Sequence, residues 1–315
     1  MTDQSSSDPH ATLAADKFRR SAGFWRLLTF MVLALLILAL VGRFFWSNAP
    51  TADHIARVVV DGTIATNPAR LKALRELGED DAVKAVIIAI NSPGGTTAGG
   101  EELYEALGAL RAQKPVVAVI NELGASAAYM TAIATDRIFA RRLSIVASIG
   151  VLFQHVNAGK LLDTIGVDLD KIASGPLKAE PDYDEAMTPE VRRSLAALVD
   201  DSFQWFVDIV AERRNLSRPV ALALADGRIM TGRMGVENKL IDAIGGEAEA
   251  IDWLESEKNI GEKLPVSTAF PHPDQGFGWL GQFLGGQARA ALGLSGSTPI
   301  ALDGLVSLWQ VDAAR

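Results

Sequence analysis

Two buried strands and the helices that follow them can be read directly from residues 83–134, VKAVIIAINSPGGTTAGGEELYEALGALRAQKPVVAVINELGASAAYMTAIA. Val83–Ile90 and Pro115–Ile120 are near-continuous apolar runs, which is typical of parallel strands covered on both faces. A helix is predicted after each run: Gly99–Gln113 has leucines at helical spacing, and Ala125–Ala134 is rich in alanine. The strand–helix–strand–helix order predicts an α/β domain with parallel pairing.

The alternation of strands and helices continues on both sides of this stretch. Upstream, Val58–Val60 is predicted as a strand and Pro68–Leu77 as a helix. Downstream, Ile138–Ala140 is a further strand. A long helix is predicted over 188–215, because it begins with a threonine N-cap and a proline at the first helical position.

The overall composition excludes several classes of protein. The chain has 315 residues, of which 49% are hydrophobic and 22% charged, so it has enough apolar residues for a folded core. Its net charge of -8 argues against a nucleic-acid partner, because binding to the phosphate backbone needs a basic surface. It has no cysteine, which excludes disulfides, zinc–thiolate sites and a cysteine nucleophile.

An uncharged segment near the N-terminus is predicted to anchor the chain in a membrane. Residues 24–46 contain a sixteen-residue apolar run between two arginines, flanked by tryptophans that suit the lipid–water interface. Basic residues are more numerous before the segment than after it, which predicts a cytoplasmic N-terminus. A cleaved signal peptide is the alternative, but Pro50 argues against cleavage after the small residues before it. We therefore expect a cytoplasmic segment (1–23), an anchor (24–46), a folded domain (47–262) and a tail (263–315).

Two turns at strand ends are candidates for chemistry, because ligands of open α/β sheets bind there. Asn91–Gly95 ends in two glycines, whose amides can approach a ligand closely and form an anion-binding nest. Gly124–Tyr129 places Ser126 between small residues at the start of a helix, similar in principle to a nucleophile elbow. Taken separately, the first segment could be an ordinary tight turn and Ser126 an N-cap.

A serine nucleophile needs a general base, and two residues qualify. Of the four histidines, only His155 lies within the predicted fold and away from the linker and tail. Lys178 is the other candidate, because it lies among small and apolar residues. A solvated lysine has a pKa near 10.4, so lowering it by about 3 units requires roughly 4 kcal/mol of differential desolvation. Such a lysine needs an enclosed, apolar site.

Five motifs in order behind an N-terminal anchor resemble the signal peptide peptidase A (SppA) family, short bacterial type. These motifs are Asn91–Gly95, Gly124–Tyr129, Ala147–Val151, Ser174–Lys178 and Asp226–Gly232. The resemblance covers roughly residues 55–250. It implies a ClpP/crotonase-like fold of repeated β-α units and a membrane-anchored serine protease.

The resemblance also implies roles for individual residues. By its pattern, Ser126 is the nucleophile and Lys178 the general base, with Ser148 orienting the lysine. Gly95, together with Gly94, supplies the oxyanion amides. No metal or cofactor is implied. Many family members have two glycines after the nucleophile where this chain has alanines at 127–128, so a changed substrate pocket is expected.

The resemblance further implies the substrate, assembly and location. Expected substrates are extended hydrophobic peptides, such as signal-peptide remnants. The chain is expected to form a ring-like homo-oligomer in which neighbouring copies supply the serine and the lysine of one site. The anchor is expected to lie in the lipid of the inner membrane, with the catalytic domain on the periplasmic side.

Three alternatives remain at this point. A ClpP-like protease would pair Ser126 with His155 instead of Lys178. A crotonase-type acyl-CoA enzyme would use the glycine amides as its oxyanion hole. A membrane scaffold would have no activity. Separately, Phe277–Leu292 has a weak amphipathic face, and we hypothesise that it docks on the ring, the membrane or the enzyme's own groove.

Overall fold

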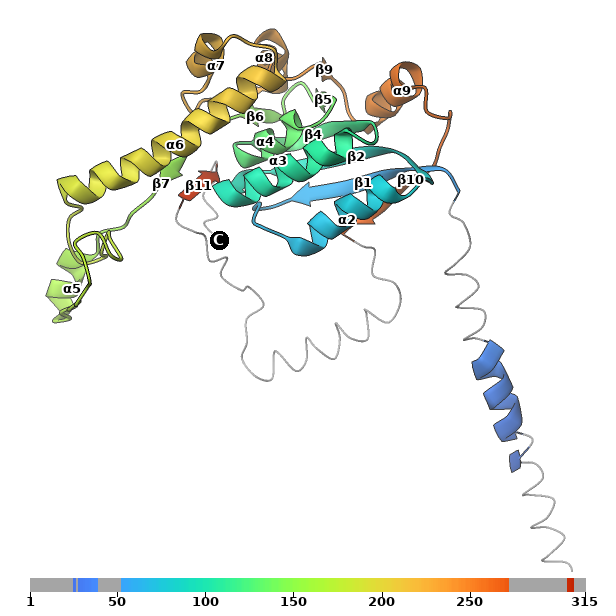
Figure 1. Ribbon diagram of the computed structural model, residues 1–315, viewed down its shortest axis with the longest axis horizontal. Coiled ribbons are helices and arrows are strands. Elements are labelled where there is room, and N and C mark those ends of the chain that lie inside the picture. Colours follow the sequence, from blue (N-terminus) through green and yellow to red (C-terminus); the bar gives the residue numbers. More distant parts are fainter. Residues whose placement is uncertain (1–24, 27, 39–51, 272–304, 309–315) are drawn as a thin grey trace, which may run out of the picture. The chain divides into compact units, whose positions relative to one another are not determined.

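The computed structural model describes residues 25–26, 28–38, 52–271 and 305–308 of a chain that forms two units, Met1–Ala52 and Asp53–Arg315 (Figure 1). In the first unit, residues 28–38 are helical. Within the described ranges, no helix is both long and apolar enough to cross a bilayer. The other positions of the expected 24–46 anchor lie mostly outside the described residues, so the anchor stays a prediction.

An eight-stranded, mostly parallel sheet forms the centre of the second unit. Its main path runs β10–β1–β2–β4–β5–β9, and β6 joins β4 and pairs with β8. All pairs are parallel except β6 with β8. The strands are β1 (His54–Asp61), β2 (Val83–Ser92), β4 (Val116–Ala125), β5 (Arg137–Ala140), β6 (Ile145–Ala147), β8 (Ile229–Thr231), β9 (Ala243–Ile244) and β10 (Val266–Phe270). The prediction of an α/β domain with parallel pairing is confirmed, and this sheet fits the ClpP-like fold.

Three helices begin directly after a residue that caps them, and the cap predicted at Thr188 is confirmed. Asn67, Thr96 and Thr188 each accept a hydrogen bond from a first-turn amide, and Pro189 occupies the first position of the longest helix. The helices of this unit are α2 (Pro68–Glu79), α3 (Thr97–Arg111), α4 (Ala127–Ile133), α5 (Gly159–Ile165), α6 (Pro189–Arg213), α7 (Arg218–Leu224), α8 (Gly232–Glu237) and α9 (Glu247–Lys258).

The two faces of the sheet are covered by different helices, because successive side chains of a strand point to opposite faces. On β2, Ile88 and Ile90 belong to the larger core, which also contains buried side chains of α3, α4 and α6. Ile87, directly before Ile88, packs instead in a smaller core with Ala250 and Leu254 of α9. A strand covered on both faces must be apolar at every position, which explains its near-continuous apolar run.

A second, three-stranded sheet lies beside the first and has the order β3–β11–β7. Its strands are β3 (Gly94–Thr96), β7 (Leu152–Phe153) and β11 (Leu305–Leu308), and both pairings are antiparallel. In Figure 1, β11 (red) lies next to the end of α3, with which it is in contact. The small sheet therefore joins the C-terminal part of the chain to the glycine turn after β2.

Two stretches differ from the expectation. Val266–Phe270 falls within the expected tail, yet it forms β10 and pairs in parallel with β1. The main sheet therefore extends past residue 262. The apolar run predicted to end at Ile120 continues as β4 to Ala125, because Leu123–Ala125 pair with β6 beyond the strand's buried half. The segment Phe277–Leu292 lies outside the described residues.

Candidate active site

Ser126 is held on a sharp turn between β4 and α4. Its backbone has φ 59° and ψ −121°, a region that residues with a side chain seldom adopt, and the residue is 1% exposed. Its amide donates to the carbonyl of Ala147 at 2.8 Å, and its carbonyl accepts from the amide of Met130 at 3.0 Å. Bonds on both sides therefore hold a strained serine at a strand-to-helix turn, which is the backbone setting of a nucleophile elbow.

The end of β6 lies directly beside this turn and carries Ser148. The register of the parallel pair β4–β6 places Ala125 opposite Ala147, so Ser126 and Ser148 follow the same ends of neighbouring strands. Ser148 also has a positive φ (52°), is 8% exposed, and donates its amide to the carbonyl of Arg228 at 2.9 Å. Both predicted serines thus lie at one edge of the sheet on fixed backbones.

The Gly94–Gly95 turn is built so that only glycine fits. Gly94 has φ +106°, and a Cβ on Gly95 would lie 1.7 Å from the carbonyl oxygen of Ile64. Ile64 forms a β-bridge with Gly95. The Ile64 amide donates to the carbonyl of Gly94 at 2.8 Å, and the Ile64 carbonyl accepts from the amide of Thr96 at 2.9 Å. Ser92 at the end of β2 pairs with Gly124 of β4, and β3 contacts α4. The predicted oxyanion turn therefore lies next to the turn of Ser126.

Ile64 is a site residue that we did not identify from the sequence. Its carbonyl and amide hold the backbone of the glycine turn, and its side chain is buried in the larger core. A single apolar residue before a helix carries no local signal of such a role, because the contact is made to a turn some thirty residues further along the chain.

Lys178 is not joined to Ser126 within one chain. It lies in a turn of the segment between α5 and α6, where its amide donates to the carbonyl of Gly175 at 3.1 Å. Its side chain is exposed, and within the described residues its amine has no hydrogen-bond or ion-pair partner. Figure 1 shows this segment (yellow-green) and α5 extending away from the sheet and from α4. The structure thus brings Ser126, Ser148 and Gly95 together but leaves Lys178 apart.

His155, the other candidate base, also has no bond to Ser126. It follows β7, and its ring stacks on Tyr183 with centroids 6.3 Å apart. Its Nε2 atom is buried and has no hydrogen-bond partner in the part of the chain that the structure describes. The ring therefore packs within the extended segment instead of orienting the serine.

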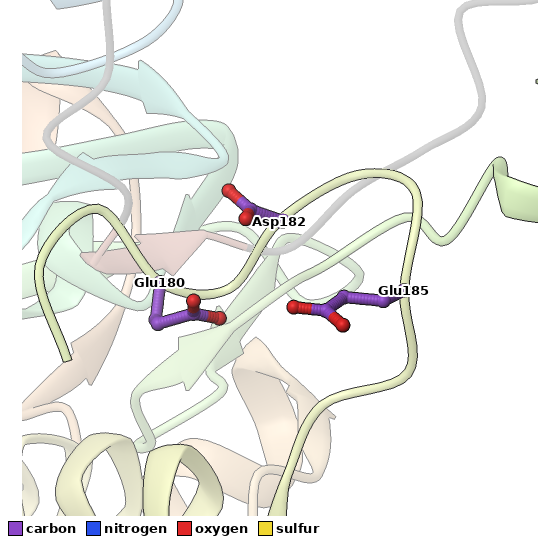
Figure 2. A group of neighbouring side chains, drawn as sticks. All are labelled: Glu180, Asp182 and Glu185. Carbon is purple, nitrogen blue, oxygen red and sulfur yellow. The ribbon is translucent and has the colours of Figure 1, made fainter. Parts of the chain in front are cut away.

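Three carboxylates gather just after Lys178, and two of them form ion pairs with a lysine. Glu180, Asp182 and Glu185 have oxygens within 4.8 Å of one another (Figure 2). The amine of Lys171 forms ion pairs with Glu180, at 2.6 Å, and with Asp182, and these bonds raise the pKa of Lys171. The cluster thus already has a counter-charge, and it closes a loop of the chain around Lys178.

A cavity of about 320 Å³ lies against the small sheet and the turn of Ser126. Thr97 directly follows β3, Val151 directly precedes β7, and Met130 is bonded to Ser126. The cavity is lined by Thr97, Ala98, Glu101, Met130, Val151, Asp201, Ser202 and Trp205. The cavity therefore presents a methionine, a valine and a tryptophan, with two carboxylates.

The alanines after Ser126 do not line this cavity. Ala127 and Ala128 are fully buried, and a methyl group on Gly100 of α3 would lie 3.0 Å from the Cβ of Ala127. The Ala127 methyl thus packs against α3. The effect of both alanines on the shape of the substrate pocket stays a prediction.

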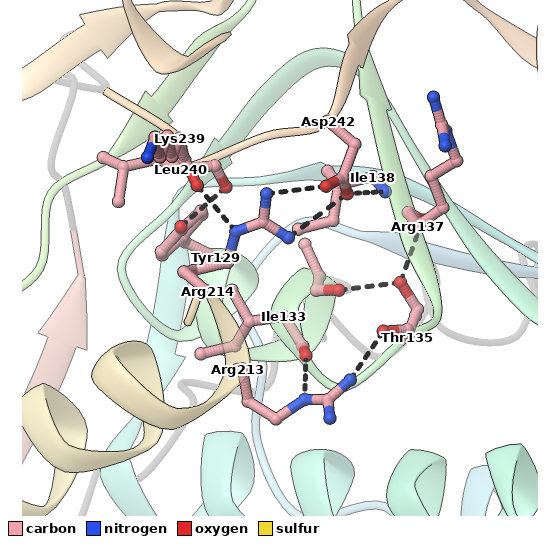
Figure 3. Close-up of polar contacts among 11 residues, drawn as sticks. Tyr129, Ile133, Thr135, Arg137, Ile138, Arg213, Arg214, Lys239, Leu240 and Asp242 are labelled. Atoms are coloured by element: carbon pink, nitrogen blue, oxygen red, sulfur yellow. Dashed lines mark hydrogen bonds and ion pairs between the residues drawn. The ribbon is translucent and has the colours of Figure 1, made fainter. Parts of the chain in front are cut away.

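A network of hydrogen bonds holds both ends of α4 (Figure 3). The hydroxyl of Tyr129 donates to the carbonyl of Leu240 at 2.7 Å, and burial raises the pKa of Tyr129. At the other end of α4, the guanidinium of Arg213 donates to the carbonyls of Ile133 and Thr135 at 2.8 and 2.9 Å. Because buried carbonyls are costly to leave unpaired, this network holds the helix that begins at Ser126 in one position.

The chain is similar to known peptidases over much of its length. Residues 108–261 match the model of Peptidase family S49. A Synechocystis protein named as a protease is 38% identical over 64% of this chain and 74% of its own length. An Enterococcus faecium protein named as a signal peptide peptidase, SppA, is 31% identical over 72% of this chain and 65% of its own length. The chloroplastic serine protease SPPA of Arabidopsis thaliana is 30% identical over 60% of this chain and 28% of its own length.

Proposed function

Because the chain belongs to peptidase family S49 and is a serine peptidase, we propose that Ser126 is its nucleophile and Lys178 its general base. The observation that carries this assignment is the backbone of Ser126, a buried serine strained at φ 59° beside the Gly94–Gly95 turn. Strain of this kind costs about 1–3 kcal/mol and is typically retained where the position of a side chain matters for chemistry. A serine that served only as an N-cap would need no such conformation and would accept a bond from the helix, which Ser126 does not.

The lysine of each site comes from a neighbouring copy. Lys178 is exposed, and the segment around it carries large apolar side chains in water, including Ile172, which is fully exposed. Further exposed apolar residues of this segment are Val156, Leu161, Ile165, Val167 and Leu169. A patch of this size on a folded domain is typical of a protein interface. Burying it against the next copy would enclose the amine of Lys178, as a lysine base requires.

The chemistry is acyl transfer. The Ser126 Oγ attacks the peptide carbonyl carbon while neutral Lys178 takes the hydroxyl proton, and the Gly95 amide stabilises the oxyanion. The tetrahedral intermediate collapses by breaking the carbon–nitrogen bond, and Lys178 gives its proton to the leaving amine. Water then attacks the ester, its proton passing to Lys178, and the ester bond to Ser126 breaks. Lys178 returns that proton to Oγ, which restores the enzyme.

We propose extended hydrophobic peptides as substrates, signal-peptide remnants among them. A peptide strand can pair with a strand edge and place alternate side chains in pockets. The edge of β3 that pairs with β11 in this structure, together with the adjoining cavity, would allow such binding once β11 is displaced. Met130, Val151 and Trp205 would favour an apolar side chain there. The carboxylates of Glu101 and Asp201 would disfavour an acidic one.

We also propose that residues 24–46 anchor the chain in the inner membrane with the peptidase domain outside the cytoplasm. The absence of cysteine allows a direct test with single engineered cysteines. Ser256→Cys, on the exposed side of α9, should react with a membrane-impermeant maleimide once the outer membrane is opened, and Ser6→Cys should not. Labelling at residue 6 alone would mean that the N-terminus lies outside the cytoplasm and the peptidase domain inside it, the opposite of the proposed topology.

Complementation between two inactive variants tests the shared site. Ser126→Ala and Lys178→Ala should each be inactive on a hydrophobic reporter peptide, and their co-expression should restore activity. In a ring whose sites each take serine from one copy and lysine from the next, random mixing rebuilds about a quarter of the sites. Failure to recover any activity in mixed assemblies would place both groups in one chain or remove Lys178 from the mechanism.

A further inference from the structure

The strand β11 is the middle strand of the small sheet, and it comes from the far end of the chain. Its residues pair on one side with β3 and on the other with β7, so Val306 lies opposite both Thr96 and Leu152. In the described part of the chain, β3 and β7 do not pair with each other. Because neighbouring strands lie about 4.8 Å apart, removing β11 would leave two strand edges roughly 10 Å apart. That gap has the width of one extended peptide.

The register places β11 over the glycine turn of the active site. Ser307 lies opposite Gly95, and Leu308 lies opposite Gly94. These are the residues whose amides are proposed to bind the oxyanion, so a substrate must bring its scissile carbonyl to this same stretch of backbone. Two strands cannot pair with the same edge of β3 at once, and β11 and a substrate therefore exclude each other.

The strand that fills the slot belongs to this same chain. Thirty-three residues separate β11 from Pro271, the last described residue before it, and an extended segment of that length can span about 100 Å. The segment can therefore reach the slot of its own domain. Its sequence, Leu-Val-Ser-Leu, is uncharged and mostly apolar, which is the chemistry proposed for the substrate.

We propose that Leu305–Leu308 occupies the peptide-binding slot between β3 and β7 as an intramolecular competitor that a substrate must displace. This inference rests on the proposed function, which identifies the slot as the place where a substrate peptide binds. If most slots are occupied by β11, the apparent affinity for substrate is the intrinsic affinity multiplied by the small fraction of slots that are open. The chemical step in an open site is unchanged. The competitor should raise KM and leave kcat as it is.

A proline at the centre of the strand tests the pairing. Val306→Pro removes the backbone N–H of the one residue that pairs on both sides, and it lies in a C-terminal strand outside the main sheet. Val311→Pro is the matched control, because it makes the same change five residues after Val306, outside Leu305–Leu308. In the full chain, Val306→Pro should lower KM for a hydrophobic peptide at least threefold and keep kcat within twofold of wild type. Val311→Pro should change neither constant, and an equal KM in all three proteins would overturn the inference.

A binding measurement separates this inference from the proposed chemistry. A fluorescent peptide with the sequence of residues 301–311 is titrated into full chains that carry Ser126→Ala, so that nothing is hydrolysed. Adding Val306→Pro should tighten binding at least threefold, and adding Val311→Pro should not. Equal affinities would overturn the inference whatever the catalytic result, whereas absence of hydrolysis alone would count against the proposed function only. A Val306→Pro effect that disappears on dilution would assign the strand to a second copy and overturn the intramolecular arrangement.

Discussion

The amide of Ser126 donates a 2.8 Å hydrogen bond to the carbonyl of Ala147, and both residues have a positive φ, 59° and 73°. The bond joins the turn after β4 to the end of β6, so neither turn can relax without the other. A strained backbone persists only where its surroundings hold it. The two predicted serines, at 126 and 148, are thereby held side by side.

Replacement of Ser126, the proposed nucleophile, should remove the activity without unfolding the protein. Ser126→Ala should lower kcat by at least about 10³-fold, because loss of a nucleophile leaves only the rate due to binding and oxyanion contacts. A fluorophosphonate probe should label the wild type and not this variant. Ser256→Ala, at an exposed position of α9, should keep full activity and labelling. Labelling that persists in Ser126→Ala would assign the nucleophile elsewhere.

The glycine turn should not accept a methyl group. Gly95→Ala would place a Cβ 1.7 Å from the Ile64 carbonyl, so the turn must shift away from the active site. We expect a loss of at least about 10² in kcat, as for removal of an oxyanion donor, together with a lower Tm.

The control for this variant is a glycine in open space. A methyl on Gly108, within α3, would meet nothing within 4 Å. Gly108→Ala should therefore stabilise the protein by about 0.5–1 kcal/mol, through the lower conformational entropy of the unfolded chain and the higher helix propensity of alanine. If Gly95→Ala kept full activity, the Gly95 amide would not be an oxyanion donor.

Lysine and histidine can be separated as general bases. Lys178→Ala should abolish activity and leave Tm unchanged in the monomeric domain, because the exposed amine has no partner there. Lys160→Ala, at an exposed position of α5, is the matched control and should remain active. His155→Ala should lose at most the packing of its ring on Tyr183. The opposite pattern, with activity lost only in His155→Ala, would replace the Ser–Lys pair by a Ser–His pair.

The loop around Lys178 should depend on its ion pairs. Lys171→Ala would leave Glu180, Asp182 and Glu185 without their counter-charge, and their repulsion should open the loop. We expect at least a tenfold loss in kcat/KM, with recovery in Lys171→Arg, because arginine can restore both pairs. Equal activity of the alanine and arginine variants would show that this loop does not position Lys178.

The hydroxyl behind α4 should contribute to stability. Tyr129→Phe leaves the buried carbonyl of Leu240 without its donor and should destabilise the fold by about 1–2 kcal/mol in urea denaturation. Tyr183→Phe is the control, because Tyr183 is 69% exposed, and it should change the free energy of unfolding by less than about 0.5 kcal/mol. Equal stability of Tyr129→Phe and wild type would mean that the hydroxyl bond is replaced in the variant.

The four adjacent strands β1, β2, β4 and β5 of the main sheet could be predicted because their signals are local. Strands such as β2 are apolar at nearly every position, and α2, α3 and α6 begin at residues that cap helices. The short strands β3, β6, β7, β8 and β9 were missed, because two or three residues carry too little pattern. Their existence depends on a partner strand more than on propensity.

In the active site, too, some features could be predicted from neighbouring residues and others could not. Ser126 and Gly95 were found from the sequence because each follows an apolar strand and lies among small residues. That Ile64 requires glycine at position 95, and that Ser148 lies one strand away from Ser126, depends on the register of strands distant in the chain.

By itself, the amino-acid sequence determined the layered α/β fold, the strand-end position of Ser126, the proposed nucleophile, and the family of the chain. These follow from periodicity and from motifs, which are properties of neighbouring residues. Only the tertiary structure decided that Lys178 stands away from Ser126 within one chain, and that Leu305–Leu308 lies across the glycine turn. Both are relations between segments far apart in sequence. The first depends on how the segment between α5 and α6 extends from the domain, and the second on which strand edges are left unpaired once the main sheet has formed.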